Sequence, residues 1–275
     1  INSNTRYLHP AQTAFADKIL SKMPGHLQVC YFVNSGSEAN ELALRLARAH
    51  TGAKGMVTPD HGYHGNTTGA VDISAYKFNK PGGVGQADWV ELVEIADDYR
   101  GSFRRNDPER AQKFADLVDP AIASLRQKGQ GVAGFIAETF PSVGGQIIPP
   151  KGYLPAVYEK VRAAGGICIA DEVQTGLGRL GTHYFAFEAQ GVVPDIVVLG
   201  KPIGNGHPIG VVVTTKEVSL LDWFTQACVR IVSANAKVKS FLIALECKGL
   251  QRLGHLSATL VLGGQGACFD QSSPR

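Results

Sequence analysis

The fold is decided by residues 166–176, GICIADEVQTG, which join a short apolar run to an acidic pair and a glycine turn. A run that is apolar throughout, without alternation, predicts a strand buried on both faces of a sheet. In parallel sheets, ligands gather at the carboxyl ends of the strands. Asp171, directly after this run, is therefore a candidate ligand-facing carboxylate. The alternative is that Asp171 only caps the following helix.

Similar runs lie on both sides of this stretch, separated by segments whose apolar residues have helical spacing. The predicted strands are residues 29–34, 55–58, 131–137, 167–170, 195–199 and 210–214. The predicted helices are residues 38–49, 108–128 and 153–164. This alternation predicts an α/β fold, with a mainly parallel sheet flanked by helices.

Two segments do not follow this alternation. Residues 76–107 form a connection rich in Gly, Asp and Arg. It is too long for an ordinary linker, so we expect it to line a site or an interface. From residue 218 onward the pattern changes: residues 233–257 could be helical, and the last residues match no element.

The composition is that of a folded chain, with 44% hydrophobic and 19% charged residues among 275. No apolar run reaches the roughly 18 residues of a membrane span. The net charge is only +3 and the basic residues are not clustered, so we predict no nucleic-acid partner. Five cysteines without CxxC spacing predict a reducing compartment, and we expect a cytoplasmic location. Organellar targeting stays open because the chain begins with Ile1.

A candidate anion site follows the first predicted strand, in the motif NSGSEAN at residues 34–40. The first amides of a helix have no partner within the helix, and the helix dipole there favours an anion. Gly36 would let the backbone approach a phosphate, and Ser37 could add a hydroxyl donor. The alternative is a helix cap without a ligand.

A candidate stacking residue lies in HGYHG, residues 61–65, where glycines flank an aromatic residue and two histidines. A flat heteroaromatic cofactor would stack on Tyr63. No third ligand is defined by the spacing of the two histidines, so we do not predict a metal site. The alternative is a plain surface turn.

A candidate nucleophile ends the predicted strand at residues 195–199 and begins the rigid turn KPIGNG. A lysine withdrawn from water has its ammonium form disfavoured, so Lys201 could attack a carbonyl and form a Schiff base. The alternative is a lysine that extends from a strand end into water. The four motifs together supply what pyridoxal phosphate requires: an anion cradle, a stacking ring, a carboxylate and a lysine.

The segments NSGSEAN, HGYHG, FIAE, IADEVQTGLGRLG and PDIVVLGKPIGNG resemble the class III pyridoxal-phosphate aminotransferases of fold type I. The resemblance runs over about residues 7–217 and implies that fold, that cofactor and a primary-amine substrate. It implies that Lys201 carries the Schiff base and that Asp171 pairs with the pyridinium nitrogen. The other implied contacts are Gly36 and Ser37 for the phosphate, Tyr63 and Val173 for the ring faces, Gln174 for the phenolic oxygen, and Glu138 nearby.

Further segments, among them ISAYKFNK and GGQIIPPKGYL, resemble the branch of phospho-lyases that act on ethanolamine phosphate or phosphohydroxylysine. Elimination of phosphate and ammonia is therefore the alternative to transamination. Arg100 is a candidate for clasping a substrate phosphate, since a guanidinium can donate two parallel hydrogen bonds. The alternative for Arg100 is a surface ion pair.

The resemblance also implies a homodimer and two domains. We expect residues 1–217 to form the cofactor-binding large domain, incomplete at its N-terminus, and residues 218–275 to form a divergent tail. The family's phosphate-binding threonine has only Thr225 as a weak candidate here. A third hypothesis follows: the chain is an inactive, truncated paralogue that binds or dimerises.

Overall fold

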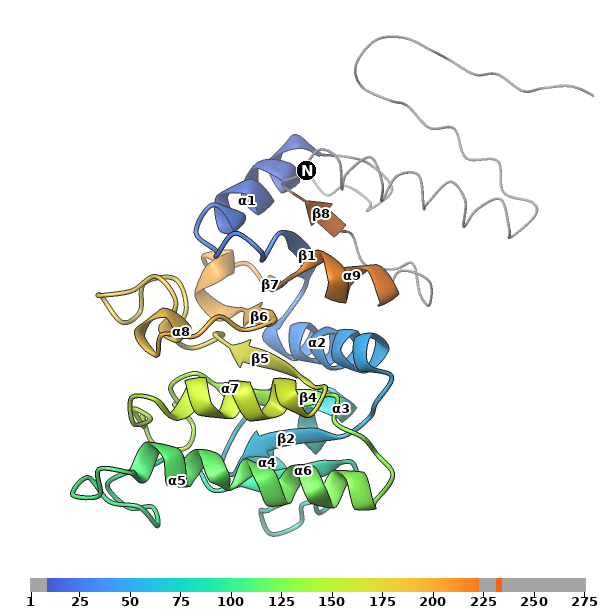
Figure 1. Ribbon diagram of the computed structural model, residues 1–275. Coiled ribbons are helices and arrows are strands. Elements are labelled where there is room, and N and C mark those ends of the chain that lie inside the picture. Colours follow the sequence, from blue (N-terminus) through green and yellow to red (C-terminus); the bar gives the residue numbers. More distant parts are fainter. Residues whose placement is uncertain (1–8, 223–230, 234–275) are drawn as a thin grey trace, which may run out of the picture. The chain divides into compact units, whose positions relative to one another are not determined.

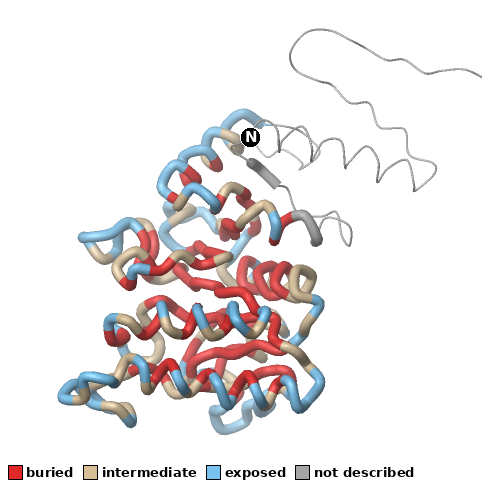
Figure 2. Tube along the Cα trace, viewed as in Figure 1, coloured by how far each residue is buried: buried red, intermediate tan, exposed pale blue. Residues whose placement is uncertain are grey.

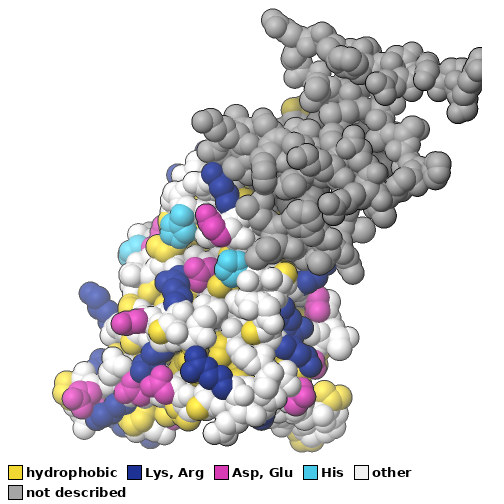
Figure 3. Space-filling view, turned by 45° about the vertical axis from the view of Figure 1, so that its right-hand side comes forward, with side chains coloured by type: hydrophobic (Ala, Val, Ile, Leu, Met, Phe, Trp, Pro, Cys, Tyr) yellow, Lys and Arg dark blue, Asp and Glu magenta, His cyan; other side chains and the backbone are white. Residues whose placement is uncertain are grey.

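The computed structural model describes residues 9–222 and 231–233 (Figure 1). Thr225 lies outside the described residues. So do the unassigned end of the chain and all but the first residue of the predicted helical segment 233–257. In the described part no helix is long and apolar enough to cross a membrane. On the face drawn in Figure 3, basic and acidic side chains are intermixed.

In this part of the chain the strands form an eight-stranded sheet in the order β3-β2-β4-β5-β6-β7-β1-β8. The pairs that join β3, β2, β4, β5 and β6 are parallel, which confirms the predicted α/β fold with a mainly parallel sheet. The strands are β1 Val29–Val33, β2 Met56–Pro59, β3 Val90–Val93, β4 Gly134–Glu138, β5 Ile167–Asp171, β6 Ile196–Leu199, β7 Gly210–Thr214 and β8 Ile231–Ser233.

The exceptions are β7, which is antiparallel to β6 and β1, and β8, which is antiparallel to β1. A parallel crossover needs a dozen or more residues, usually including a helix. The connection from Leu199 to Gly210 is shorter and holds only the 3-10 turn Lys201–Gly204. The short connection therefore makes β7 run back beside β6.

The helices cover both faces of the sheet (Figure 1). They are α1 Pro10–Leu20, α2 Gly36–Thr51, α3 Thr68–Asp72, α4 Ala75–Phe78, α5 Arg110–Asp116, α6 Val118–Gln127, α7 Tyr153–Ala163, α8 Ala186–Ala189 and α9 Lys216–Asp222. The single helix predicted over residues 108–128 is wrong, because it is divided at Leu117. Pro120 has no N–H to donate to the Asp116 carbonyl, and this explains the break.

The connection 76–107 contains a strand that the sequence pattern did not reveal. β3 occupies Val90–Val93 at the edge of the sheet, in parallel register with β2. The strand has only four residues, and Glu91 interrupts its apolar run. Its neighbour Trp89 is buried, 6% exposed, so this part of the connection belongs to the core.

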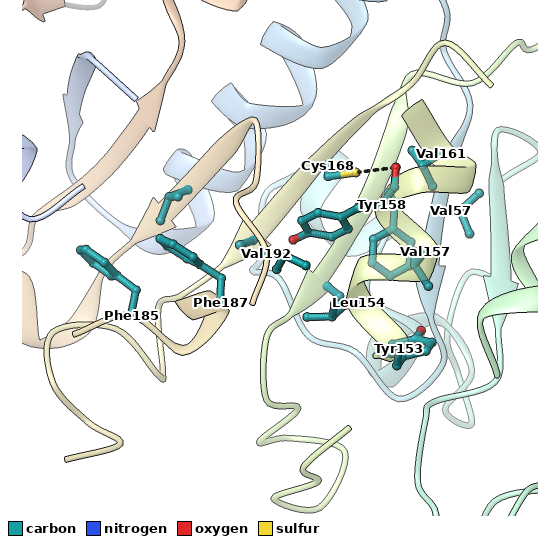
Figure 4. Close-up of a cluster of buried hydrophobic side chains, with 14 of the residues drawn as sticks. Val57, Tyr153, Leu154, Val157, Tyr158, Val161, Cys168, Phe185, Phe187 and Val192 are labelled. Carbon is teal, nitrogen blue, oxygen red and sulfur yellow. Dashed lines mark hydrogen bonds between the residues drawn. The ribbon is translucent and has the colours of Figure 1, made fainter. Parts of the chain in front are cut away.

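Alternating strand residues build two apolar layers, one on each face of the sheet (Figure 2). One layer packs against α1, α5, α6 and α7, and Figure 4 shows Tyr158 and Val157 of α7 beside Cys168 of β5. The other packs against α2 and includes Val218 of α9. Cys30 and Cys168 are buried free thiols, as the apolar runs around them predict.

Candidate active site

Two carboxylates lie side by side at the carboxyl ends of adjacent parallel strands. Glu138 ends β4, Asp171 ends β5, and the two residues are paired in register. Ile136 and Ile169, two residues earlier in each strand, face the layer that contains α2. Because side chains alternate along a strand, Glu138 and Asp171 face the same side. Glu172, the next residue, faces the opposite side.

Asp171 is enclosed by donors from distant parts of the chain, and its side chain is only 4% exposed. Its Oδ2 accepts a hydrogen bond from Asn40 Nδ2 at 2.8 Å and lies 2.8 Å from His64 Nδ1. Its Oδ1 accepts from the Val173 backbone N–H at 3.1 Å. Asn40 also donates to the His64 carbonyl, so α2, the 61–65 turn and β5 are tied together at this carboxylate.

The N-terminus of α2 approaches the same place. Ser35 caps the helix by accepting from the Glu38 N–H, so the Gly36 and Ser37 amides remain without intrahelical partners. Ser37 Oγ accepts from the Asn66 N–H at 3.1 Å, which leaves its own proton available to donate. Gly65, at φ +136°, passes so close that a Cβ there would lie 2.6 Å from Ser37 Oγ.

Glu138 positions the turn that carries Tyr63. Its carboxylate accepts from the Tyr63 N–H at 3.3 Å and from the Ser142 N–H at 3.1 Å. Burial raises the pKa of Glu138 and the Asp171 charge raises it further, whereas His64 and the two N–H donors oppose the shift. Ser142 Oγ in turn accepts from Gln174 Nε2 at 2.8 Å, which fixes the Gln174 amide.

Glu172 is a buried carboxylate on the other side of the strand end. It accepts hydrogen bonds from the Thr139 and Thr175 hydroxyls, each at 2.8 Å, and from the Ala186 and Phe187 N–H groups of α8. Burial raises its pKa, against the effect of these donors. The residues after Asp171 are therefore anchored to α8, which holds Val173 and Gln174 in place.

Lys201 follows β6 with φ +41°, a left-handed conformation that is strained for a residue with a side chain. Its side chain is exposed. In this single chain Lys201 is therefore not withdrawn from water, as in the alternative of a lysine that extends from a strand end. A Cβ at the preceding Gly200 would lie 3.1 Å from Val173 Cγ1 and 3.3 Å from the Gly36 Cα, so Gly200 approaches both residues closely.

The predicted cofactor residues line one cavity of about 230 Å³. Its walls are Gly36, Ser37, Asn40, Tyr63, His64, Gly65, Glu138, Val143, Asp171, Val173, Gln174 and Lys201. Arg100 is not in this set and is exposed. A larger cavity of about 350 Å³ lies along α2 and shares none of these side chains.

Sequence reasoning missed Asn40 and His64, although both lie in motifs that it singled out. Asn40 is one helical turn after Gly36, and that spacing places it on the same face of α2. His64 was weighed only as a metal ligand. Among the described residues no cluster of three or more His, Cys, Asp or Glu side chains could hold a metal ion.

The residues present fit pyridoxal phosphate. Two buried polar atoms at the cavity, Asn40 Oδ1 and His64 Nε2, have no partner among the described residues. The carboxylate of Asp171 has no Lys or Arg partner in this part of the chain and suits a pyridinium nitrogen. The free amides of α2 suit a phosphate. The fold and this cavity define a pyridoxal-phosphate-binding α/β domain.

Comparison with known proteins identifies the family. The family model for class III aminotransferases matches residues 3–222. The chain belongs to the class III aminotransferase family. An alanine–glyoxylate aminotransferase 2-like protein of Drosophila melanogaster is 51% identical over 222 residues, which is 80% of this chain and 45% of that protein. The chain thus spans less than half the length of that relative.

Two solved structures share the fold. A phospholyase from Arthrobacter, in complex with phosphoethanolamine, is 39% identical and has a TM-score of 0.74. The match covers 92% of this chain and 59% of the phospholyase chain. An amine transaminase from an uncultivated Pseudomonas species, in its pyridoxal-phosphate-bound form, is 26% identical with a TM-score of 0.72, covering 82% and 52%. The family and such neighbours indicate pyridoxal phosphate as the cofactor.

Proposed function

We propose that this chain is the cofactor-binding part of an aminotransferase that acts on a primary amine. One observation carries the proposal: the buried carboxylate of Asp171, held by Asn40 and His64, shares a cavity with Lys201 and the N-terminus of α2. Bound pyridoxal phosphate supplies an aldehyde that condenses with amines and a ring that takes up the electron pair of a broken C–H bond.

Each residue has a proposed task. The Lys201 amine forms the covalent link to the cofactor and, when released, accepts the proton beside the substrate nitrogen at Nζ. Asp171 keeps a positive charge on the ring nitrogen, while Asn40 and His64 keep Asp171 oriented. The other proposed contacts are Gly36 and Ser37 for the phosphate, Tyr63 and Val173 for the ring faces, Gln174 for the phenolic oxygen, and Glu138 for the Tyr63 turn.

The second candidate function is a phospho-lyase, and the likeness to the Arthrobacter phospholyase favours it. In that reaction, ethanolamine phosphate and water give acetaldehyde, ammonia and inorganic phosphate. No keto acid is consumed, because the cofactor returns to its aldehyde form. Transamination leaves the cofactor in its amino form and requires a keto acid acceptor in every cycle.

The test has two stages. First, pyridoxal phosphate is added to the chain, and we expect visible absorbance that borohydride reduction fixes to Lys201. A colourless chain, or cofactor recovered on another lysine, contradicts the proposal and favours the inactive paralogue. Second, amines are screened with and without pyruvate: amine loss that requires pyruvate indicates an aminotransferase, and phosphate release without pyruvate indicates a phospho-lyase.

The assembly and location belong to the same proposal. We propose a homodimer, since the resemblance implies a site between subunits and Lys201 is exposed in the single chain. The division into a large domain, residues 1–217, and a tail, residues 218–275, stays a prediction, and α9 spans that boundary. The buried free thiols of Cys30 and Cys168 support a reducing compartment such as the cytoplasm.

A further inference from the structure

A group of aromatic and basic side chains adjoins the cavity on the side of Tyr63. Lys77 Nζ lies 5.5 Å from the centroid of the Tyr63 ring, and Tyr76 meets that ring edge-on with centroids 6.1 Å apart. Lys80 Nζ lies 3.3 Å from the centroid of the Tyr76 ring. One ammonium group and one phenol thus lie against the Tyr63 ring, which lines the cavity, and the second ammonium group lies against that phenol.

This group is held in place by the turn that also contacts Asp171. The Tyr76 N–H donates to the Gly62 carbonyl at 3.2 Å, and the His64 N–H donates to Ser74 Oγ at 2.8 Å. The start of the short helix α4 is therefore tied to the turn of residues 61–65. These two hydrogen bonds, through Ser74 and Tyr76, fix the position of Lys77 relative to the cavity.

Neither ammonium is neutralised in the part of the chain that the structure describes. No carboxylate there lies within 4.0 Å of Lys77 or Lys80, whereas Lys113, Lys128 and Lys160 are all paired with acids. Lys77 is also partly buried, and a partly desolvated cation favours an anionic partner. A hydrogen bond from Lys80, together with its charge, lowers the pKa of the Tyr76 phenol.

We propose that Lys77, with Tyr76 and Lys80, forms a subsite for the phosphate group of a phosphorylated amine substrate. The inference rests on the proposed function, because it takes the cavity as the amine site. A phosphate monoester has up to two negative charges and three free oxygens, which match two ammonium groups and one hydroxyl. A carboxylate has one charge and two oxygens, so it matches the two ammonium groups and the hydroxyl less completely. Neither these three side chains nor Arg100 lines the cavity itself, but Lys77 and Tyr76 contact the ring of Tyr63, which does.

The test measures the binding of three probes, ethanolamine phosphate, ethanolamine and β-alanine, by calorimetry. The variants are Lys77→Gln, the charge-conserving Lys77→Arg, and the control Lys22→Gln. Lys22 is a matched control, since it is exposed and its Nζ lies 5.7 Å from the Tyr184 ring centroid. We expect Lys77→Gln to weaken ethanolamine phosphate binding about tenfold or more, the effect of losing one charged hydrogen bond. Ethanolamine binding should not change, Lys77→Arg should keep most of the affinity, and Lys22→Gln should match the wild type.

Three outcomes overturn the subsite: equal affinity of the wild type for ethanolamine and ethanolamine phosphate, unchanged phosphate affinity in Lys77→Gln, or equal weakening of both probes. A larger effect of Lys77→Gln on β-alanine than on ethanolamine phosphate reassigns the subsite to a carboxylate and also contradicts the proposal. Failure of the proposed function has a different signature, since no variant then gains visible absorbance with pyridoxal phosphate. In either case, the affinity of the wild type and of Lys77→Gln for ethanolamine phosphate decides whether Lys77 belongs to a phosphate subsite.

Discussion

Asp171 shows how one residue obtains its properties from its surroundings. Its two oxygens accept from an amide side chain and a backbone N–H, and Oδ2 also contacts a histidine ring. None of these partners is a Lys or Arg, so a positive ring nitrogen would be the natural counter-charge. The adjacent Glu172 is just as buried but is saturated by four donors from the other side of the strand end. Adjacent carboxylates thus have different hydrogen-bond environments.

We predict that Asp171→Asn keeps cofactor binding but lowers turnover by about 100-fold or more. The amide can still accept a hydrogen bond, but it cannot stabilise a pyridinium charge. Visible absorbance with pyridoxal phosphate and steady-state turnover are measured on the same preparation. Asp195→Asn is the control, because Asp195 pairs with Arg162 away from the cavity. Near-normal turnover of Asp171→Asn would mean that Asp171 only stabilises the turn that follows β5.

A second prediction concerns Glu138 and pH. Burial raises the folded-state pKa of Glu138 above its ordinary value of 4.5, so the folded chain binds more protons than the unfolded chain above that pH. The free energy of unfolding that this residue contributes therefore falls as pH rises from about 4.5 and levels off above the folded-state pKa. Glu138→Gln should remove this slope, so the variant gains stability relative to the wild type between pH 4.5 and 7. Urea unfolding of both proteins across this pH range measures the difference. Parallel curves of unfolding free energy against pH would contradict the prediction.

At the level of elements, the site depends on the close approach of the 61–65 turn to the first turn of α2. Gly65 makes this approach possible, because a Cβ there would lie 2.7 Å from the Ser37 Cα as well as 2.6 Å from its hydroxyl. A side chain at residue 65 would therefore force either the 61–65 turn or the first turn of α2 to move. The candidate anion site is therefore made by two elements, although each motif alone has the pattern of an ordinary cap or turn.

We predict that Gly65→Ala weakens pyridoxal phosphate binding by about tenfold or more, because it displaces the first turn of α2. Gly82→Ala is the matched control: Gly82 has φ +80°, but nothing lies within 4 Å of the position of its Cβ. Both variants place an alanine at a positive φ, which costs about 1–3 kcal/mol, but only the alanine at residue 65 meets Ser37. Absorbance titration with the cofactor separates them, and equal affinities would show that the approach is unimportant for binding.

At the scale of the whole molecule, the exposure of Lys201 is the feature that a single chain leaves unexplained. A second copy placed over the cavity would bury Lys201. This physical reason is independent of the resemblance and supports the same assembly.

We predict that the chain forms a homodimer in solution, with twice the chain mass of 29.3 kDa. Multi-angle light scattering at working concentration gives the mass directly. Pyridoxal phosphate is added in a parallel run, because a shared site should make the dimer more stable. A strictly monomeric species that still turns over an amine would refute the shared site.

The sequence by itself determined the order of the main elements and where chemistry would gather. Apolar runs, N-caps and glycine turns act through neighbouring residues, so residues 29–34, 167–170 and 195–199 were recognisable as strands and their ends as candidate site positions. The same local signals failed for β3, which is short and contains Glu91. They also failed at Leu117, where Pro120 divides one predicted helix into two.

Only the tertiary structure decided which of these positions meet. Asn40 is 131 residues from Asp171 and His64 is 107 residues from it, and their hydrogen bonds depend on the sheet order and on register. The tertiary structure also decides that Glu138 pairs with Asp171, that Lys201 is exposed and that Arg100 lies outside the cavity lining. The reason is physical: local pattern specifies which face a side chain occupies, whereas proximity between distant faces arises only when the strands pair and the helices pack on them.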